Sequence, residues 1–228
     1  MSNDTPSGTP ARASADKTRA ALIEAGLKLF GEKGFAAAST REIAAEARAN
    51  IGSIAYHFGG KEKLRDACAV HIVETVATVA EPVFAIPPPA DPEAAAAQFR
   101  VAAERMAGFL VMAPQVSGFV QFILREIQHP GPAFEIIYAG LVEKVHRRLC
   151  AIWAAASGDD PESERTRIAV FTMIGQTVYF RIAREAVMRR MGWREIGPAE
   201  AGLITDTVLD NVLAALAAHR KNREEPGS

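Results

Sequence analysis

The chain has little of what marks a secreted or membrane protein. Cysteine occurs only twice in 228 residues, at Cys68 and Cys150, so a disulfide framework is not expected. Residues 1–15 contain no apolar core, and we therefore expect no signal peptide there. No uninterrupted apolar run approaches the roughly 20 residues that span a bilayer. These absences predict a soluble, cytoplasmic protein with no membrane partner.

A large excess of positive charge is also missing. The chain has 26 Lys and Arg against 27 Asp and Glu, for a net charge of −1. This balance disfavours an architectural protein that coats nucleic acid without regard to sequence, because such binding depends on a high density of cations. Any affinity for DNA must come from cations that are placed locally.

Alternating strand patterns are absent too, and helical periodicity takes their place. We expect an all-α protein of about nine helices, with an N-terminal three-helix helix-turn-helix head and a larger C-terminal helical bundle. Pro-rich segments and breaks in the periodicity set the boundaries. The expected parts are a disordered arm at 1–15, a DNA-binding domain at 16–63, a ligand-binding and dimerisation domain at 64–220, and a disordered tail at 221–228.

Residues 39–64 contain two short helical patterns separated by a turn. Ser39 and Glu42 have the spacing of a capping box at the first helix, and Asn50 is suited to cap the second. The second pattern has an inward face and an outward face. The residues predicted to face inward are Ile51, Ile54, Ala55 and Phe58, and those predicted to face outward are Gly52, Ser53, Tyr56 and His57. An exposed face of this make-up suits insertion into the major groove of DNA.

The N-terminal third resembles the TetR family of transcription regulators. The matching residues are Phe30-Gly31-Glu32-Lys33-Gly34-Phe35, Thr40-Arg41-Glu42-Ile43-Ala44, Gly52, Tyr56-His57-Phe58 and Lys61-Glu62-Lys63-Leu64. The resemblance implies that Tyr56 and Lys61 bind phosphates of double-stranded operator DNA. Gly52 and Ser53, at the start of the second helix, would then lie nearest the base edges, with His57 on the same outward face.

Three further residues of this region have more than one interpretation. Thr40 and Arg41 start the first helix, where side chains and free backbone amides together can donate to phosphates, although Arg41 can instead reach a base. Arg48 stands in the turn, where many members of the family have Gly. Either the turn is locally different here, or Arg48 accepts a strain of about 1 kcal/mol. Its guanidinium either lies near the DNA backbone or is simply solvated.

The remainder resembles the CecR-like subgroup of the same family. The stretches that carry this resemblance are Phe122-Ile123-Leu124-Arg125-Glu126, Ile174-Gly175-Gln176, Tyr179-Phe180-Arg181 and Arg190-Met191-Gly192-Trp193. The resemblance implies that an unidentified small-molecule effector enters the C-terminal bundle and shifts the two heads of a dimer between DNA-binding and non-binding spacings. The expected function is sequence-specific regulation of transcription, with repression as its expected sense.

Aromatic side chains are numerous between residues 92 and 156, which predicts a mostly apolar pocket with a few polar anchors. The residues predicted to line it are Phe99, Phe109, Phe122, Arg125, Gln176 and Tyr179. Arg125 and Glu126 follow an apolar run, so at least one of them should be partly buried and need a partner. Either a polar group points into the ligand cavity, or one of the two faces solvent while the other pairs with a residue such as Arg181, Arg184 or Glu185.

Two long helical patterns near the C-terminus carry apolar stripes that can close an isologous four-helix contact. The residues predicted to form this homodimer contact are Met173, Phe180, Val208 and Val212. A two-fold dimer predicts a pseudo-palindromic operator whose half-sites lie about one helical turn apart, or a multiple of that.

The main rival class is a helical carrier or an enzyme that uses the C-terminal cavity. The sequence shows no nucleophile–base pair, carboxylate cluster or Gly-rich phosphate loop, so no catalytic residue and no cofactor are assigned. His146 and Cys150 share a helix face, as do Cys68 and His71, but a transition-metal site normally needs three or four ligands. We therefore interpret these pairs as structural and predict no metal site.

Overall fold

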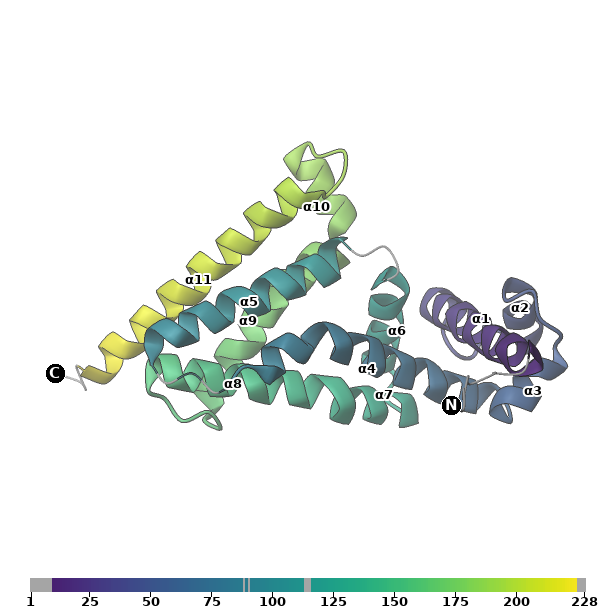
Figure 1. Ribbon diagram of the computed structural model, residues 1–228. Helices are drawn as coiled ribbons and strands as arrows, with labels where there is room; N and C mark the ends of the chain where they lie inside the picture. Colours follow the sequence, from purple (N-terminus) through teal and green to yellow (C-terminus); the bar gives the residue numbers. More distant parts are fainter. Residues whose placement is uncertain (1–9, 88, 90, 113–115, 225–228) are drawn as a thin grey trace, which may run out of the picture. The chain divides into compact units, whose positions relative to one another are not determined.

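A computed structural model describes residues 10–87, 89, 91–112 and 116–224 of the chain (Figure 1). The described residues form helices and no strand, which confirms the all-α prediction. The helices are α1 (Pro10–Lys33), α2 (Thr40–Glu46), α3 (Gly52–Phe58), α4 (Lys61–Ala85), α5 (Pro92–Ala107), α6 (Val116–Gln128), α7 (Pro132–Ile137), α8 (Glu143–Ser157), α9 (Glu164–Ile182), α10 (Arg184–Met191) and α11 (Pro198–Glu224), with π-helical segments at Gly108–Met112 and Tyr138–Val142.

The chain divides into two compact units, and the division does not fall at a single point of the sequence. The first, here called the head unit, comprises Met1–Glu74 together with Ser117–Tyr138. The second, here called the bundle unit, comprises Thr75–Val116 and Ala139–Ser228. The head unit thus includes nearly all of α6 as well as α7, whereas both helices were predicted to lie in the second domain, residues 64–220. Helix α4 starts in the head unit and ends in the bundle unit.

Both chain ends are more helical than the sequence predicted. Helix α1 starts at Pro10, within the arm expected at 1–15, and α11 continues to Glu224, within the tail expected at 221–228. The rest of those two expected segments, residues 1–9 and 225–228, lies outside the described residues.

The core of the head unit forms where α1, α4 and α6 meet. The buried face of α1 is formed by Leu22, Ala25, Gly26, Leu29 and Phe30. Phe122 of α6 is fully buried, with its ring centroid 6.3 Å from that of Phe30. Gly31 permits this approach, because a Cβ built on it would lie 3.0 Å from Cβ of Gln121 and 3.2 Å from the backbone nitrogen of Phe122. The absence of a side chain at Gly31 therefore lets α6 pack closely on the end of α1.

The core of the bundle unit is contributed by α5, α8, α9 and α11 (Figure 1). Its largest buried side chains are Trp153 of α8 and Phe99 of α5, whose rings meet edge to face with centroids 6.1 Å apart. Helices α4 and α11 each contain a stretch long and apolar enough to cross a membrane, by length and composition alone. Core helices have the same composition, and α11 places Val208, Leu209 and Val212 in this core.

Candidate DNA-binding site

Helix α2 starts at the capping box that the sequence predicted. Ser39 Oγ accepts from the backbone amide of Glu42 at 3.2 Å, and Glu42 Oε2 accepts from the backbone amide of Ser39 at 2.9 Å. Lys33, in the last turn of α1, donates to Glu42 Oε1 at 2.6 Å. The bonds from Lys33 and Ser39 lower the pKa of Glu42 from its usual 4.5 to about 2. These contacts link the start of α2 to the end of α1.

The turn after α2 is a Schellman motif with Arg48 at its left-handed position. The amide of Ala49 donates to the carbonyl of Ala44 at 2.8 Å, and the amide of Arg48 donates to that of Ala45 at 3.1 Å. Arg48 has φ +51°, and no other non-glycine residue in the described part of the chain has positive φ. The turn therefore keeps the geometry that favours Gly, and of the two alternatives left open above, Arg48 takes the strained one.

Helix α3 presents most of the face that the sequence predicted, with two corrections. Ile54 is buried and Phe58 is partly buried, whereas Ile51 is 52% exposed and Ala55 is exposed rather than inward. Helix α3 begins at Gly52, so Ile51 precedes the packed face as an N-cap without a side-chain bond. Asn50, predicted to cap this helix, accepts from the backbone amide of Gly52 at 2.8 Å, and this bond satisfies a free amide at the helix start.

The outward face of α3 is open to solvent. Tyr56 is 82% exposed and Gly52 is also exposed, while Ser53 and His57 are partly exposed. The rings of Tyr56 and His57 meet edge to face with centroids 4.9 Å apart. The two side chains therefore form one continuous aromatic and polar surface on the second half of the helix.

Helix α4 starts with a cation, Lys61, three residues after the end of α3. Gly59 and Gly60 make the turn between the helices with φ +80° and +156°. Lys61 Nζ lies 4.4 Å from the ring centroid of Phe35, so the ring holds the ammonium group by a cation–π contact. The spacing of Phe35 and Lys61 in sequence gives no sign of this contact.

The remaining two predicted DNA contacts lie at the first turn of α2. Arg41 is exposed and Thr40 is partly exposed. All seven residues predicted to contact DNA thus lie in one segment, α2 to the start of α4, which packs on α1.

Of the six residues predicted to line a ligand pocket, Phe122 and Arg125 lie in the head unit. Phe122 is a core residue beside Phe30. Arg125 Nε donates to the carbonyl of Gly31 at 3.3 Å, and its Nη2 donates to that of Glu32 at 3.2 Å. Arg125 thus has carbonyl partners at the C-terminus of α1, where the helix dipole also favours a cation.

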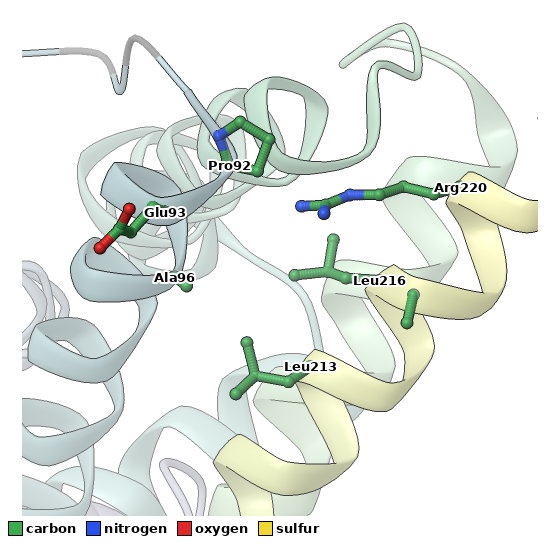
Figure 2. Close-up of a pocket in the computed structure, with 7 residues that line it drawn as sticks. Pro92, Glu93, Ala96, Leu213, Leu216 and Arg220 are labelled. Atoms are coloured by element: carbon green, nitrogen blue, oxygen red, sulfur yellow. The ribbon is translucent and has the colours of Figure 1, made fainter.

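The other four predicted pocket residues lie in the bundle unit but in different surroundings. Phe99 is buried in the core, Phe109 is partly buried, and Tyr179 is exposed on α9. Gln176 Oε1 accepts from Asn211 Nδ2 of α11 at 2.9 Å. A hollow of about 340 Å³ opens between α5 and α11 instead (Figure 2). Its lining residues are Pro92, Glu93, Ala96, Leu213, Leu216, Ala217 and Arg220.

The four residues predicted for the dimer contact mostly face the interior of the bundle unit. Met173, Val208 and Val212 are buried within a single subunit, and Phe180 is partly buried against the same core. Side chains already packed in this way leave little surface for a partner to cover. Other faces of the same two helices carry exposed apolar side chains.

In the two Cys–His pairs that share helix faces, Cys68, Cys150 and His146 are buried and His71 is partly buried. Cys150 Sγ lies 3.7 Å from His146 Nδ1, and His146 Nε2 lies 3.1 Å from the carbonyl oxygen of Arg167. Cys68 Sγ donates to the carbonyl of Ile23 at 3.5 Å. Burial raises the pKa of Cys150 to about 11 and raises that of Cys68 as well. Both thiols are therefore protonated and unreactive at neutral pH.

Helix α2 is capped, and a short turn joins it to α3, which has an exposed polar face. This arrangement defines a helix-turn-helix DNA-binding protein. Comparison with known families agrees with this assignment. Residues 22–68 match the profile described as "Bacterial regulatory proteins, tetR family", and residues 95–219 match "HTH-type transcriptional dual regulator CecR, C-terminal domain". The chain belongs to the TetR family of transcription regulators, in its CecR-like group. It is a DNA-binding regulator of transcription.

Individual relatives support the same conclusion. The chain is 32% identical over 212 residues to the HTH-type transcriptional dual regulator CecR of Shigella flexneri, covering 89% of this chain and 94% of the relative. Its fold is similar to that of AibR in complex with isovaleryl coenzyme A and operator DNA, with a TM-score of 0.63, 17% identity, and 84% and 96% of the two chains covered. It is also similar to the TetR-family regulator SCO4454 of Streptomyces coelicolor, with a TM-score of 0.64, 16% identity, and 90% and 97% covered.

Proposed function

We propose that two copies of this chain bind a pseudo-palindromic operator and repress transcription until a small-molecule effector releases them. The observation that carries the DNA-binding part is the exposed face of α3, on which Tyr56 is almost fully solvated. Lys61, three residues after the end of α3, lies over the Phe35 ring. A short helix with such a face can enter the major groove, while cations at its margins bind phosphates. The proposal places this regulator in the cytoplasm, where it meets the DNA.

The proposed residue roles follow from position on the helices. Gly52 and Ser53 start α3 and would lie nearest the base edges, since the N-terminal residues of a recognition helix contact bases. Tyr56 and Lys61 would bind phosphates on one side of the groove, with His57 next to Tyr56. Thr40 and Arg41 would bind the backbone at the start of α2, where free amides favour an anion.

Helix α6 is proposed to carry the effector signal to the head. It contacts the end of α1 through Arg125, whose guanidinium donates to the carbonyls of Gly31 and Glu32. It contacts α4 through Glu126, which pairs with Arg65. Residues Thr75–Val116, which precede most of α6 in the chain, belong to the bundle unit, so α6 would be the first helix of the head unit to receive a ligand-dependent change in that part of the bundle unit. Such a ligand must bind the DNA-free conformation more tightly than the DNA-bound one.

The effector site is proposed to lie in the bundle unit, with the hollow of Figure 2 as its opening. Its volume of about 340 Å³ is within the range of small-molecule pockets, and its wall is formed mainly by apolar side chains of α5 and α11. The Arg220 guanidinium reaches across the hollow toward Pro92 (Figure 2), which favours an amphipathic anion. A thermal-shift screen of short-chain carboxylates tests this, with Leu213→Trp as the blocked variant. A hit that stabilises both proteins equally would place the site elsewhere.

The DNA-binding proposal is tested by selecting fragments from a random DNA pool with the purified protein. We expect the selected fragments to share a pseudo-palindromic consensus. The protein should bind scrambled DNA more weakly than this consensus at every salt concentration tested. Ser53→Ala should change the preferred bases within each half-site, whereas Lys63→Ala, on an exposed part of α4, should not. Equal binding to selected and scrambled DNA would indicate an architectural protein. No binding to either would favour the helical carrier or enzyme.

A further inference from the structure

Helix α9 carries an apolar stripe that its own subunit does not cover. The side chains of Ile168, Phe171, Tyr179 and Ile182 are each more than half exposed. Their spacing places them along one face of a helix that is regular from Glu164 to Ile182. Contiguous apolar side chains on the surface of a monomer mark a site of association.

The stripe is symmetric about Gly175. Ile168 and Ile182 lie seven residues before and after it, and Phe171 and Tyr179 lie four residues before and after it. An antiparallel copy of the same stripe therefore meets isoleucine with isoleucine and ring with ring.

Gly175 itself has no explanation within one subunit. It lies in the middle of α9, where glycine weakens a helix relative to alanine. It is exposed, and a Cβ built on it would meet no atom within 4 Å. Glycine at a helix surface is favoured where a second backbone must come close. The centre of the stripe is the point at which two antiparallel copies of α9 would cross most closely.

We propose that α9 pairs with α9 of a second copy of this chain, antiparallel and with Gly175 of both copies on the two-fold axis. This inference rests on the proposed dimer and fixes its register. Helix α11 continues the contact at one margin, because Asn211 donates to Gln176 and places its exposed face beside that of α9. Leu203 extends the exposed apolar surface along α11.

Cysteine cross-linking tests the register on the full chain. Residues on a two-fold axis face their own copies, so Gly175→Cys should form an intersubunit disulfide on mild oxidation. Ile168→Cys alone should cross-link at least about tenfold more slowly, since its copy lies more than the roughly 7 Å Cα–Cα limit away. Ile168→Cys combined with Ile182→Cys should restore rapid cross-linking. The native cysteines give no background, because Cys68 and Cys150 are both buried.

The outcomes separate this register from the proposed dimer. If Ile168→Cys alone cross-links as fast as Gly175→Cys, the helices pair in another register or direction and the inference is wrong. If the unmodified protein sediments as a monomer at micromolar concentration, the proposed dimer itself is wrong.

A larger side chain at position 175 allows a second test of the register, which measures dimer dissociation and does not depend on oxidation. Gly175→Leu should raise the dimer dissociation constant at least about tenfold, because two leucines would meet at the axis. The isolated subunit should remain folded, since the added side chain has no neighbour to displace. Ala97→Leu adds similar bulk at an exposed position of α5 and should leave the dimer intact. A Gly175→Leu protein that dimerises like the parent would overturn the inference.

Discussion

Arg65 of α4 and Glu126 of α6 form a two-point ion pair within the head unit. Arg65 Nε donates to Glu126 Oε1 at 2.7 Å, and Nη2 donates to Oε2 at 2.5 Å. The Glu126 side chain is 3% exposed and that of Arg65 is 17% exposed, and the guanidinium also lies 4.8 Å from the ring centroid of Phe35. A pair of parallel charge-assisted bonds fixes orientation as well as distance. Helix α6 is therefore held in one register against α4, close to Lys61.

Removing one partner of this pair should destabilise the head unit. Arg65→Met leaves a buried carboxylate without a partner, and we expect a loss of about 3 kcal/mol in the free energy of unfolding. The double variant Arg65→Met, Glu126→Leu should lose less than the sum of the single losses, because no charge is left buried. Urea unfolding followed by far-UV circular dichroism measures all three variants. Strictly additive losses would show that the pair is not coupled.

Replacing Arg48 should stabilise the protein if the strain at φ +51° is real. Arg48→Gly should raise the free energy of unfolding by about 0.5–1 kcal/mol, because glycine adopts left-handed backbone angles without a Cβ clash. Arg48→Ala is the matched control, since it removes the guanidinium and keeps the Cβ. If both variants weaken operator binding equally, the guanidinium contacts DNA. If Gly is no more stable than Ala, the turn is not strained.

Lys61→Ala should weaken DNA binding to the same degree on all sequences. A lost phosphate contact lowers the slope of log affinity against log salt concentration by about one unit. Lys63→Ala is the matched control two residues away, where the ammonium is well exposed and pairs with Asp66. Fluorescence anisotropy at several salt concentrations measures both variants. Equal slopes for the two proteins would remove Lys61 from the interface.

The capping box should make the head unit sensitive to acid. The pKa of Glu42 is about 2 in the folded chain, below its usual 4.5, so its contribution to stability is complete above pH 4.5. This contribution is lost as the pH falls from 4.5 toward 2, where the folded state must also take up the proton. Glu42→Gln should therefore flatten the fall in melting temperature over this range. Glu24→Gln, at an exposed position of α1, should retain the parental curve.

Local pattern was sufficient where local contacts decide the structure. The capping box, the buried face of α1 and the exposed positions Gly52, Ser53 and Tyr56 follow from spacing along one helix, and the structure has them. Ile51 and Ala55 were predicted to face inward and are exposed, because α3 is only seven residues long and packs through Ile54 and Phe58. On so short a helix the periodic rule cannot tell which end residues actually meet a neighbour.

The C-terminal helices show the same limit on a larger scale. A helix with apolar residues on several faces does not reveal which face its own subunit covers, so Met173 and Val208 were assigned to a partner and lie in the core. At least one of Arg125 and Glu126 was expected to be partly buried and to need a partner. Glu126 is buried and pairs with Arg65, 61 residues away in sequence, whereas Arg125 is exposed and donates to carbonyls at the end of α1.

The sequence by itself determined the all-α fold, the family and the helix-turn-helix segment, because capping, turn chemistry and helical periodicity act over a few residues. Only the tertiary structure decided that α6 belongs with the head, that Lys61 rests on Phe35, and that Ile168 and Tyr179 face outward on α9. These facts depend on which helix faces pack together. Which faces pack together depends on the free energy of burying the apolar faces of all the helices at once. No single stretch of residues specifies that free energy.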